Sequence, residues 1–297
     1  MAFRYASLEE ARIAAARWDG CPDSVEHVEN FSSSVFKFST RAGKTQILRF
    51  VDQEQRSFDQ IQGELEFLVY LKAKGIRCCS PERSIDGALA ISFEAASGLQ
   101  SCSSMNYVNG LELTDTSPNW DKVYYREWGR NLASIHRASR SYAPAKPKRW
   151  QWDEENLILN FDRLLPKHDR DSRSLFKALM DECHSLPKTE ATFGLIHGDH
   201  APNNLVFDPD TKQITAIDFG NCCYHWYMAD LGIALSVARR KENREEIKAA
   251  LLEGYTESEA LPQGHEKLID LFIRLRAMYV YLDRLNRYGE IRPPRRG

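Results

Sequence analysis

The sequence lacks any long hydrophobic run. A membrane-spanning helix needs roughly 18 consecutive apolar residues, and no stretch of the 297 residues provides them. No apolar segment of the signal-peptide type follows Met1, and no segment repeats in tandem. The sequence therefore argues against an integral membrane protein and against a repeat protein. We expect a cytoplasmic protein without membrane association.

The sequence also lacks a large excess of either charge, and its number of cysteines is odd. The formal net charge is −2, and the basic tail Arg292–Arg296 is too short to favour nucleic-acid binding. The cysteines number seven, and the pairs Cys78-Cys79 and Cys222-Cys223 have no two-residue spacer of the zinc-site kind. We expect reduced thiols. With 42% hydrophobic residues, the chain can bury a core without disulfides or a structural metal.

One polar segment stands between short apolar runs. It is His197–Asn204, followed by Ile217–Gly220. The runs around it predict strands, and a turn-forming stretch joins the last two as a hairpin: 192–196, 205–207 and 213–217, with the turn at 208–212. Asp199, Asn204 and Asp218 therefore lie at strand ends. Asp199 can accept a hydroxyl proton, and the other two offer the oxygen ligands that Mg²⁺ prefers.

The pattern His-Gly-Asp-x-x-x-x-Asn followed by Ile-Asp-Phe-Gly resembles the aminoglycoside phosphotransferase-like and choline-kinase-like enzymes, which share the protein-kinase fold. The resemblance implies an α+β fold of two lobes, with a small antiparallel sheet in the N-terminal lobe and a mostly helical C-terminal lobe. It implies ATP and Mg²⁺ as cofactors and a hydroxyl group as acceptor. Asp199 would be the catalytic base, and Asn204 and Asp218 the magnesium ligands.

A kinase fold requires further elements upstream. Segments 35–40 and 45–51 read as antiparallel strands, and 58–74 as a helix with one apolar stripe. In similar phosphotransferases a lysine of the third strand binds phosphates and pairs with a helix glutamate. Here those positions read Arg49 and Glu64. Arginine can bridge two phosphates but is not equivalent to lysine; Lys37 and Lys44 remain alternatives.

The loop expected to cover the nucleotide has no glycines. It reads Asn30-Phe31-Ser32-Ser33-Ser34, and small serines still allow backbone N–H groups to approach a phosphate. Candidate strands 87–93 and 100–105 lead to the segment 106–110, which resembles the hinge of these enzymes. Backbone groups near Asn106 and Val108 would contact adenine, and Met105 would stand at the rear of the pocket.

These motifs divide the chain into an N-terminal lobe (1–105), a hinge (106–110) and a C-terminal lobe (111–297). The capping box Ser7–Glu10 predicts an extra helix to about Trp18. Apolar spacing predicts three helices of the second lobe: 120–140, 153–165 and 172–186. The resemblance implies packing roles for His136 and His197. It also implies that Asp230 accepts backbone N–H bonds from the loop that carries Asp199.

The sequence gives less information about which molecule accepts the phosphoryl group. Tyr224, Trp226 and Tyr227 can line a pocket for a sugar or an amine, and aromatic clusters also form cores. From Leu111 onward acidic and basic residues are equal in number, which favours a neutral or zwitterionic metabolite over a polycationic aminoglycoside. Two alternatives stay open. One is a protein Ser/Thr kinase of this fold, and the other is a catalytically weak nucleotide-binding regulator.

Overall fold

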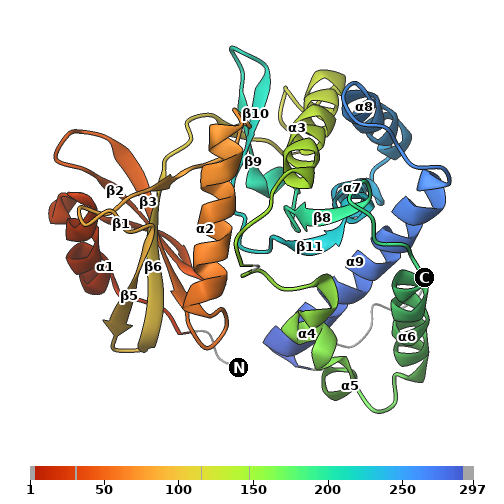
Figure 1. The fold of residues 1–297 in the computed structure, drawn as a ribbon, viewed down its shortest axis with the longest axis horizontal. Helices are drawn as coiled ribbons and strands as arrows, with labels where there is room; N and C mark the ends of the chain where they lie inside the picture. Colours follow the sequence, from red (N-terminus) through yellow and green to blue (C-terminus); the bar gives the residue numbers. More distant parts are fainter. Residues whose placement is uncertain (1–3, 31, 115, 147, 290–297) are drawn as a thin grey trace.

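The structure is a computed structural model, which describes residues 4–30, 32–114, 116–146 and 148–289. Phe31, the start of the chain at Met1 and the basic tail Arg292–Arg296 lie outside these ranges. Two lobes lie side by side in Figure 1, a sheet-containing lobe on the left and a mainly helical lobe on the right. Among the described residues, no helix is long and apolar enough to cross a membrane.

The N-terminal lobe is built on a six-stranded antiparallel sheet of order β1-β2-β3-β6-β4, with β5 also paired to β6. The predicted strands at 35–40 and 45–51 form β2 and β3, and the pairing places Arg49 opposite Val35 and Ser103. The strands are β1 (Glu26–Asn30), β2 (Ser34–Ser39), β3 (Thr45–Asp52), β4 (Pro81–Glu82), β5 (Ala90–Ala95) and β6 (Gly98–Asn106).

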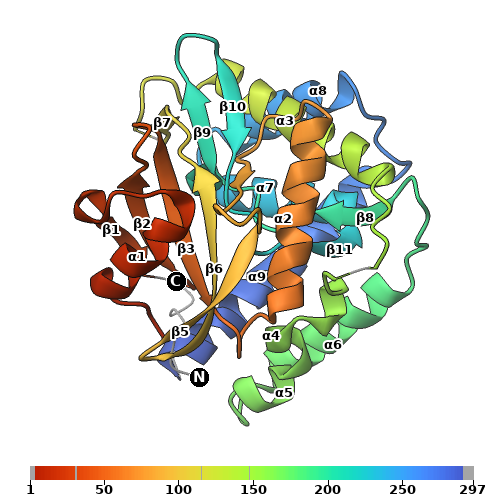
Figure 2. The same ribbon diagram turned by 60° about the vertical axis from the view of Figure 1, so that its left-hand side comes forward.

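Two helices cover opposite faces of this sheet (Figures 1 and 2). Helix α1 (Leu8–Ala15) continues as a 3₁₀ turn to Trp18, as predicted, and a second 3₁₀ turn spans Pro22–Ser24. Its alanines pack with Phe36, Phe38 and Leu48 in a separate small core. Helix α2 (Phe58–Ala73) begins at a Ser57 capping box and buries its predicted stripe in the main core.

Within the described residues, the C-terminal lobe combines helices with five short strands. Its strands are β7 (Leu111–Glu112), β8 (Phe193–Ile196), β9 (Leu205–Asp208), β10 (Gln213–Ala216) and β11 (Cys223–Trp226). The larger helices are α3 (Lys122–Arg140), α6 (Arg170–His184), α7 (Tyr227–Ala238), α8 (Arg244–Thr256) and α9 (His265–Tyr288). β9 and β10 form the predicted hairpin, and β11 pairs with β8. We propose that residues 106–110, which follow β6, join the lobes.

The single helix predicted at 153–165 is wrong. This segment is a 3₁₀ turn at Trp152–Glu154 and two single-turn helices, α4 (Asn156–Leu159) and α5 (Phe161–Leu164). Residues six apart point about 120° away from each other on a continuous helix. The break at Glu155 allows both Trp152 and Ile158 to be buried. The break also turns Glu155 towards the cleft between the lobes.

Candidate active site

A cleft of about 490 Å³ separates the lobes. Arg49 and Glu64 line it from the N-terminal lobe, and Asp199 and Asp218 line it from the C-terminal lobe. Ser32 and Ser33 also line it, from the turn between β1 and β2. Segments 150 residues apart in the sequence therefore meet at one site.

The loop that carries Asp199 (His197–Asn204, called the catalytic loop) is anchored by a buried aspartate. Asp230 of α7 accepts the backbone N–H of His197 at 2.8 Å and that of Gly198 at 2.9 Å, and its Oδ2 lies 3.2 Å from His136 Nε2. Burial alone would raise the pKa of Asp230, but the His136 contact and neighbouring histidines lower it to about 2. The predicted role of Asp230 is confirmed by these bonds.

Gly198 and His197 fix the path of the same loop. Gly198 has φ +80°, and a Cβ there would lie 2.2 Å from the Asn221 carbonyl oxygen, so the position requires glycine. His197 donates from Nε2 to the Ile217 carbonyl at 3.0 Å and accepts the Asp199 N–H at 3.2 Å. Its ring centroid lies 4.3 Å from that of Phe219. His197 therefore joins the catalytic loop to the Asp218–Gly220 segment.

Asp199 is held by a residue of the last helix. Arg276 of α9 donates from Nη2 to Asp199 Oδ1 at 2.5 Å. Among the described residues, Oδ2 of Asp199 has no hydrogen-bond or ion-pair partner. The arginine therefore orients the carboxylate and leaves one oxygen able to accept a proton. The sequence did not identify Arg276, because one arginine on an amphipathic helix is usually solvated.

Local hydrogen bonds hold Asn204 and Asp218, the two residues predicted to bind a metal ion. Asn204 donates from Nδ2 to the Asp199 carbonyl at 2.8 Å, which fixes the direction of its amide. Asp218 has φ +56° and its Oδ1 accepts the Gly220 N–H at 3.2 Å. Asp tolerates this left-handed conformation better than most residues, and such conformations concentrate at functional sites. The part of the chain that the structure describes has no cluster of three or more His, Cys, Asp or Glu for a metal.

Arg49 and Glu64 form a buried ion pair. Arg49 Nη2 lies 2.7 Å from Glu64 Oε1, and Arg49 Nη1 lies 3.7 Å from Asp218 Oδ1. Burial would lower the pKa of Arg49, but the two carboxylates outweigh it and raise the pKa above its ordinary value. The guanidinium is therefore permanently charged. Its Nε is buried without a hydrogen-bond partner in the described residues.

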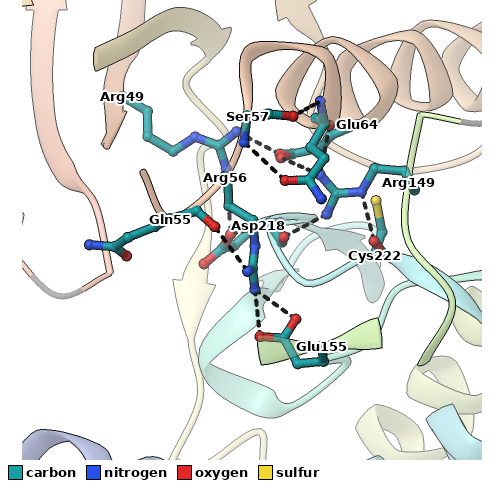
Figure 3. Close-up of polar contacts among 11 residues, drawn as sticks. Arg49, Gln55, Arg56, Ser57, Glu64, Arg149, Glu155, Asp218 and Cys222 are labelled. Carbon is teal, nitrogen blue, oxygen red and sulfur yellow. Dashed lines mark hydrogen bonds and ion pairs between the residues drawn. The ribbon is translucent and has the colours of Figure 1, made fainter. Parts of the chain in front are cut away.

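Arg149 is a second buried arginine, and no sequence motif identifies it. Its guanidinium donates to three backbone carbonyls, of Cys222 at 2.7 Å, Gly220 at 2.6 Å and Gln60 at 2.8 Å, and its Nη1 lies 3.8 Å from Glu64 Oε2. Figure 3 shows it beside Glu64 and Cys222. Arg149 thus ties α2 to the segment that follows Asp218. Only long-range contacts reveal this, because residue 149 lies in a connecting segment.

Arg56 and Glu155, which both line the cleft, form a further contact between the lobes. Arg56, just before α2, donates from Nη2 to both carboxylate oxygens of Glu155, at 3.0 and 2.8 Å (Figure 3). The guanidinium carbons of Arg56 and Arg149 lie 4.2 and 4.1 Å from the centroid of the Trp150 ring. Such cation–π contacts stabilise the charges where water is excluded. The lobes are therefore joined beside the site.

Some predicted residues lie away from the cleft lining. The Ser34 hydroxyl is buried and accepts the Ala6 N–H at 2.9 Å. The Asn106 N–H donates to the Ser80 carbonyl at 3.0 Å, and its Oδ1 accepts the Ser80 N–H at 2.6 Å. Val108 packs against the main core. Of the alternative cations, Lys37 pairs with Glu26 at 3.3 Å on the exposed side of the sheet, and Lys44 is exposed.

The expected aromatic pocket at 224–227 is different in the structure. Cys223–Trp226 is a strand, so its side chains alternate between two sides. Cys223 and His225 line a small cavity, while Trp226 and Tyr227 do not line it and are buried in the main core. The aromatic residues around the cavity come mainly from other segments: Trp150, Trp152, Phe176, Phe272 and Tyr279.

The Asp230 anchor leads to a prediction about stability and pH. Its pKa of about 2 lies below the ordinary value, so its contribution is complete above about pH 4 and is lost as the pH falls towards 2, roughly 2–3 kcal/mol in all. Asp230→Asn replaces one acceptor by an N–H₂ group facing a backbone N–H. It should lower the free energy of unfolding by ~3 kcal/mol at pH 7 and flatten this acid dependence. Urea unfolding at pH 7 and pH 3 measures both, and an unchanged acid slope would contradict the role.

The chain is similar to known proteins in sequence and in fold. The APH model, described as the phosphotransferase enzyme family, matches residues 25–268. The amicoumacin kinase of Bacillus subtilis (strain 168) is 28% identical over 279 residues, which are 90% of this chain and 82% of that protein. The chain therefore belongs to the phosphotransferase enzyme family.

Solved structures show the same fold. Amicoumacin kinase hAmiN, in complex with AMP-PNP, Ca²⁺ and Ami, has a TM-score of 0.89 at 24% identity over 98% of this chain and 89% of that one. A microcompartment-associated aminopropanol kinase has a TM-score of 0.79 at 22% identity over 96% and 91% of the two chains. The predicted family and the two-lobed kinase-like fold are thus confirmed. The protein is a small-molecule phosphotransferase with an alcohol group as acceptor.

Proposed function

We propose that the protein transfers the γ-phosphoryl group of ATP, with Mg²⁺, to a hydroxyl group of a small neutral or zwitterionic molecule. One observation carries this proposal. A buried arginine–glutamate pair, Asp218 and Asp199 line the same cleft, although they come from β3, α2 and two separate loops. A cation, a metal-binding carboxylate and a proton acceptor are the parts that phosphoryl transfer requires.

The residues of the cleft fit a nucleotide and a divalent metal. Arg49 Nη1 lies 3.7 Å from Asp218 Oδ1, beyond hydrogen-bond distance, so it retains a donor for phosphate oxygens. Asp218 would supply a charged ligand from the cleft. Asn204, whose Oδ1 accepts the Asn203 Nδ2–H at 3.1 Å and which lies outside the cleft lining, would supply a neutral one. This set suits Mg²⁺, which keeps several waters and phosphate oxygens in its octahedron. The bound metal supplies charge neutralisation for the phosphates.

Asp199 receives the proton of the acceptor. As the hydroxyl oxygen forms its bond to the γ-phosphorus, the bond to the β-phosphate oxygen breaks and ADP leaves. The hydroxyl proton passes to Asp199 Oδ2, the oxygen that Arg276 does not engage. Arg276 keeps the carboxylate in this orientation. Asp230 holds the loop in place by accepting the backbone N–H groups of His197 and Gly198.

Charge balance in the cleft supports a neutral or zwitterionic acceptor. Apart from Asp218, each carboxylate that the C-terminal lobe contributes to the cleft is paired with an arginine: Glu155 with Arg56, Asp199 with Arg276, and Asp283 with Arg287. A polycationic aminoglycoside would need carboxylates free of such partners. The names of the similar kinases, for amicoumacin and aminopropanol, agree with a hydroxylated small molecule as the acceptor class.

The two alternatives have less support. A protein kinase presents an extended platform for its substrate after the metal-binding segment. Here only Asn221 and Cys222 lie between Gly220 and β11, and β11 pairs with β8 and leads directly into α7 at Tyr227. A regulator without activity would not require Asp199 and Asp218 to line the same cleft.

The proposal is tested with a panel of hydroxylated acceptors. Hydroxy amino acids, amino alcohols, sugars and kanamycin-like aminoglycosides are incubated with ATP and Mg²⁺, and ADP release is measured beside transfer onto casein. We expect acceptor-dependent ADP release with at least one neutral or zwitterionic compound. Labelling of casein alone would favour the protein-kinase alternative, and nucleotide binding without any turnover would favour the regulator.

The Arg49–Glu64 pair leads to a prediction about nucleotide affinity. Each alanine substitution should weaken ATP binding or lower turnover, and the double variant should lose less than the sum by ~0.5–3 kcal/mol, because the residues act as a pair. Arg49→Lys should keep substantial activity without reaching wild type, since lysine lacks the bidentate fork. Lys37→Ala is the matched control on the neighbouring strand and should change neither value. Strict additivity in ATP binding calorimetry would refute the pairing.

A further inference from the structure

A small cavity lies directly behind the catalytic loop. Its volume is about 80 Å³. Apolar and aromatic side chains from four helices of the C-terminal lobe form most of its wall, including Ile158 of α4, Phe176 of α6, Ile233 of α7, and Phe272 and Leu275 of α9. Nothing in the proposed phosphoryl transfer uses this cavity. Tight packing leaves few voids larger than a water molecule in a protein interior.

The cavity adjoins the main cleft at the reacting end. Glu155, Asn221, Arg276 and Tyr279 line both spaces. Gly198, the residue before Asp199, also lines the cavity. A molecule whose hydroxyl lies at Asp199 therefore has this space immediately beside it. The cavity lies on the acceptor side, because Arg49 and the Ser32-Ser33 turn line only the cleft.

The interior of the cavity has no net charge. Its charged residues, Glu155 and Arg276, are those shared with the cleft, and they are paired with Arg56 and Asp199 respectively. Two rings of the wall can titrate. Burial lowers the pKa of His225 to about 3 and raises the pKa of Tyr279, so both are neutral at pH 7. An ammonium group would find no counter-charge deep inside. An alkyl group would lose no hydrogen bonds there.

We propose that this cavity is a specificity subsite that binds an apolar branch of the acceptor, next to the hydroxyl that is phosphorylated. The inference rests on the proposed function and narrows its acceptor class. A dry apolar cavity of roughly 150 Å³ binds benzene, so about 80 Å³ suits a branched alkyl group of roughly three or four carbons. The acceptor is therefore amphipathic: a polar hydroxylated part lies in the charged cleft, and a compact apolar branch lies in the cavity.

Direct binding of isobutanol to the nucleotide-free protein tests the subsite. We expect saturable methyl NMR shifts at Ile158 and Ile233 at millimolar alcohol. Ile233→Phe, which fills the cavity, should weaken binding at least tenfold, as judged at Ile158. Val237→Phe, on the exposed side of the same helix, is the control and should bind as wild type. Leu275→Ala enlarges the cavity and should bind benzyl alcohol, which the wild type should exclude. No binding, or binding unaffected by Ile233→Phe, overturns the proposal.

Phosphoryl transfer forms the second part of the test. Threonine and 3-hydroxyleucine carry the same zwitterionic group and differ by two carbons at the branch, and each buried methylene contributes roughly fourfold. Wild type should prefer 3-hydroxyleucine roughly 15-fold in kcat/KM, and Ile233→Phe should remove this preference. Transfer to both without preference overturns the subsite and leaves the proposed function standing. Cavity-specific alcohol binding without transfer to any hydroxyl compound supports the subsite and contradicts the proposed function.

Discussion

Asp199→Asn should lower turnover by ~100-fold or more while ATP affinity stays within a few-fold of wild type. Asparagine keeps the shape and can still accept the Arg276 hydrogen bond through its Oδ1. It cannot take a proton from the acceptor hydroxyl. Steady-state kinetics with an accepted alcohol and calorimetry with a non-hydrolysable ATP analogue separate the two effects.

The control for this variant is Asp210→Asn, in the exposed turn between β9 and β10. It removes the same charge outside the cleft and should leave turnover unchanged. Near-normal turnover of Asp199→Asn would remove Asp199 from the role of base. A parallel loss of ATP affinity would instead point to damage of the nucleotide site.

Asp218→Ala should have the second large effect, the loss of Mg²⁺-dependent nucleotide binding and a fall in turnover of ~100-fold or more. Alanine also strains the backbone at φ +56°, at roughly 1–2 kcal/mol. Asp218→Asn separates the two causes, because asparagine tolerates this conformation but lacks the charge. We expect both variants to lose metal-dependent binding, measured as ATP affinity over a magnesium titration.

Asn204→Ala completes the comparison of the two metal ligands. It removes a neutral ligand, so high magnesium or manganese should restore much of its activity. The same magnesium dependence in the Asp218 variants, the Asn204 variant and wild type would contradict the assignment of both residues.

The sequence predicted the elements that depend on local patterns. The strands at 35–40 and 45–51, the helix at 58–74 and the hairpin at 205–217 are each specified by neighbouring residues. The spacing of Asp199 and Asp218 is likewise local, since a short hairpin connects them. These patterns were sufficient to predict the fold and to bring Asp199 and Asp218 together at one cleft.

The contacts that orient those residues were not predictable in this way. Arg276 lies 77 residues after Asp199, and Arg149 lies 71 before Gly220. Neither belongs to a motif, and their partners are mainly backbone carbonyls or a carboxylate brought near by the fold. The predicted aromatic lining differs from the observed one for a related reason. Tyr224, Trp226 and Tyr227 are close in sequence and suggested one surface. Strand alternation instead turns Cys223 and His225 to the cavity, and Trp226 and Tyr227 are buried in the main core.

The fate of the γ-phosphoryl group tests the central claim most directly. The enzyme is incubated with Mg²⁺, the acceptor panel and ATP that carries ¹⁸O at the non-bridging γ-oxygens, and the small molecules and the protein are analysed by mass spectrometry. We predict a phosphate monoester of one small alcohol that retains all the label, is formed only with magnesium, and is reduced at least ~100-fold in Asp199→Asn. Label found only in inorganic phosphate or on protein serine, with no labelled small molecule, would contradict the account.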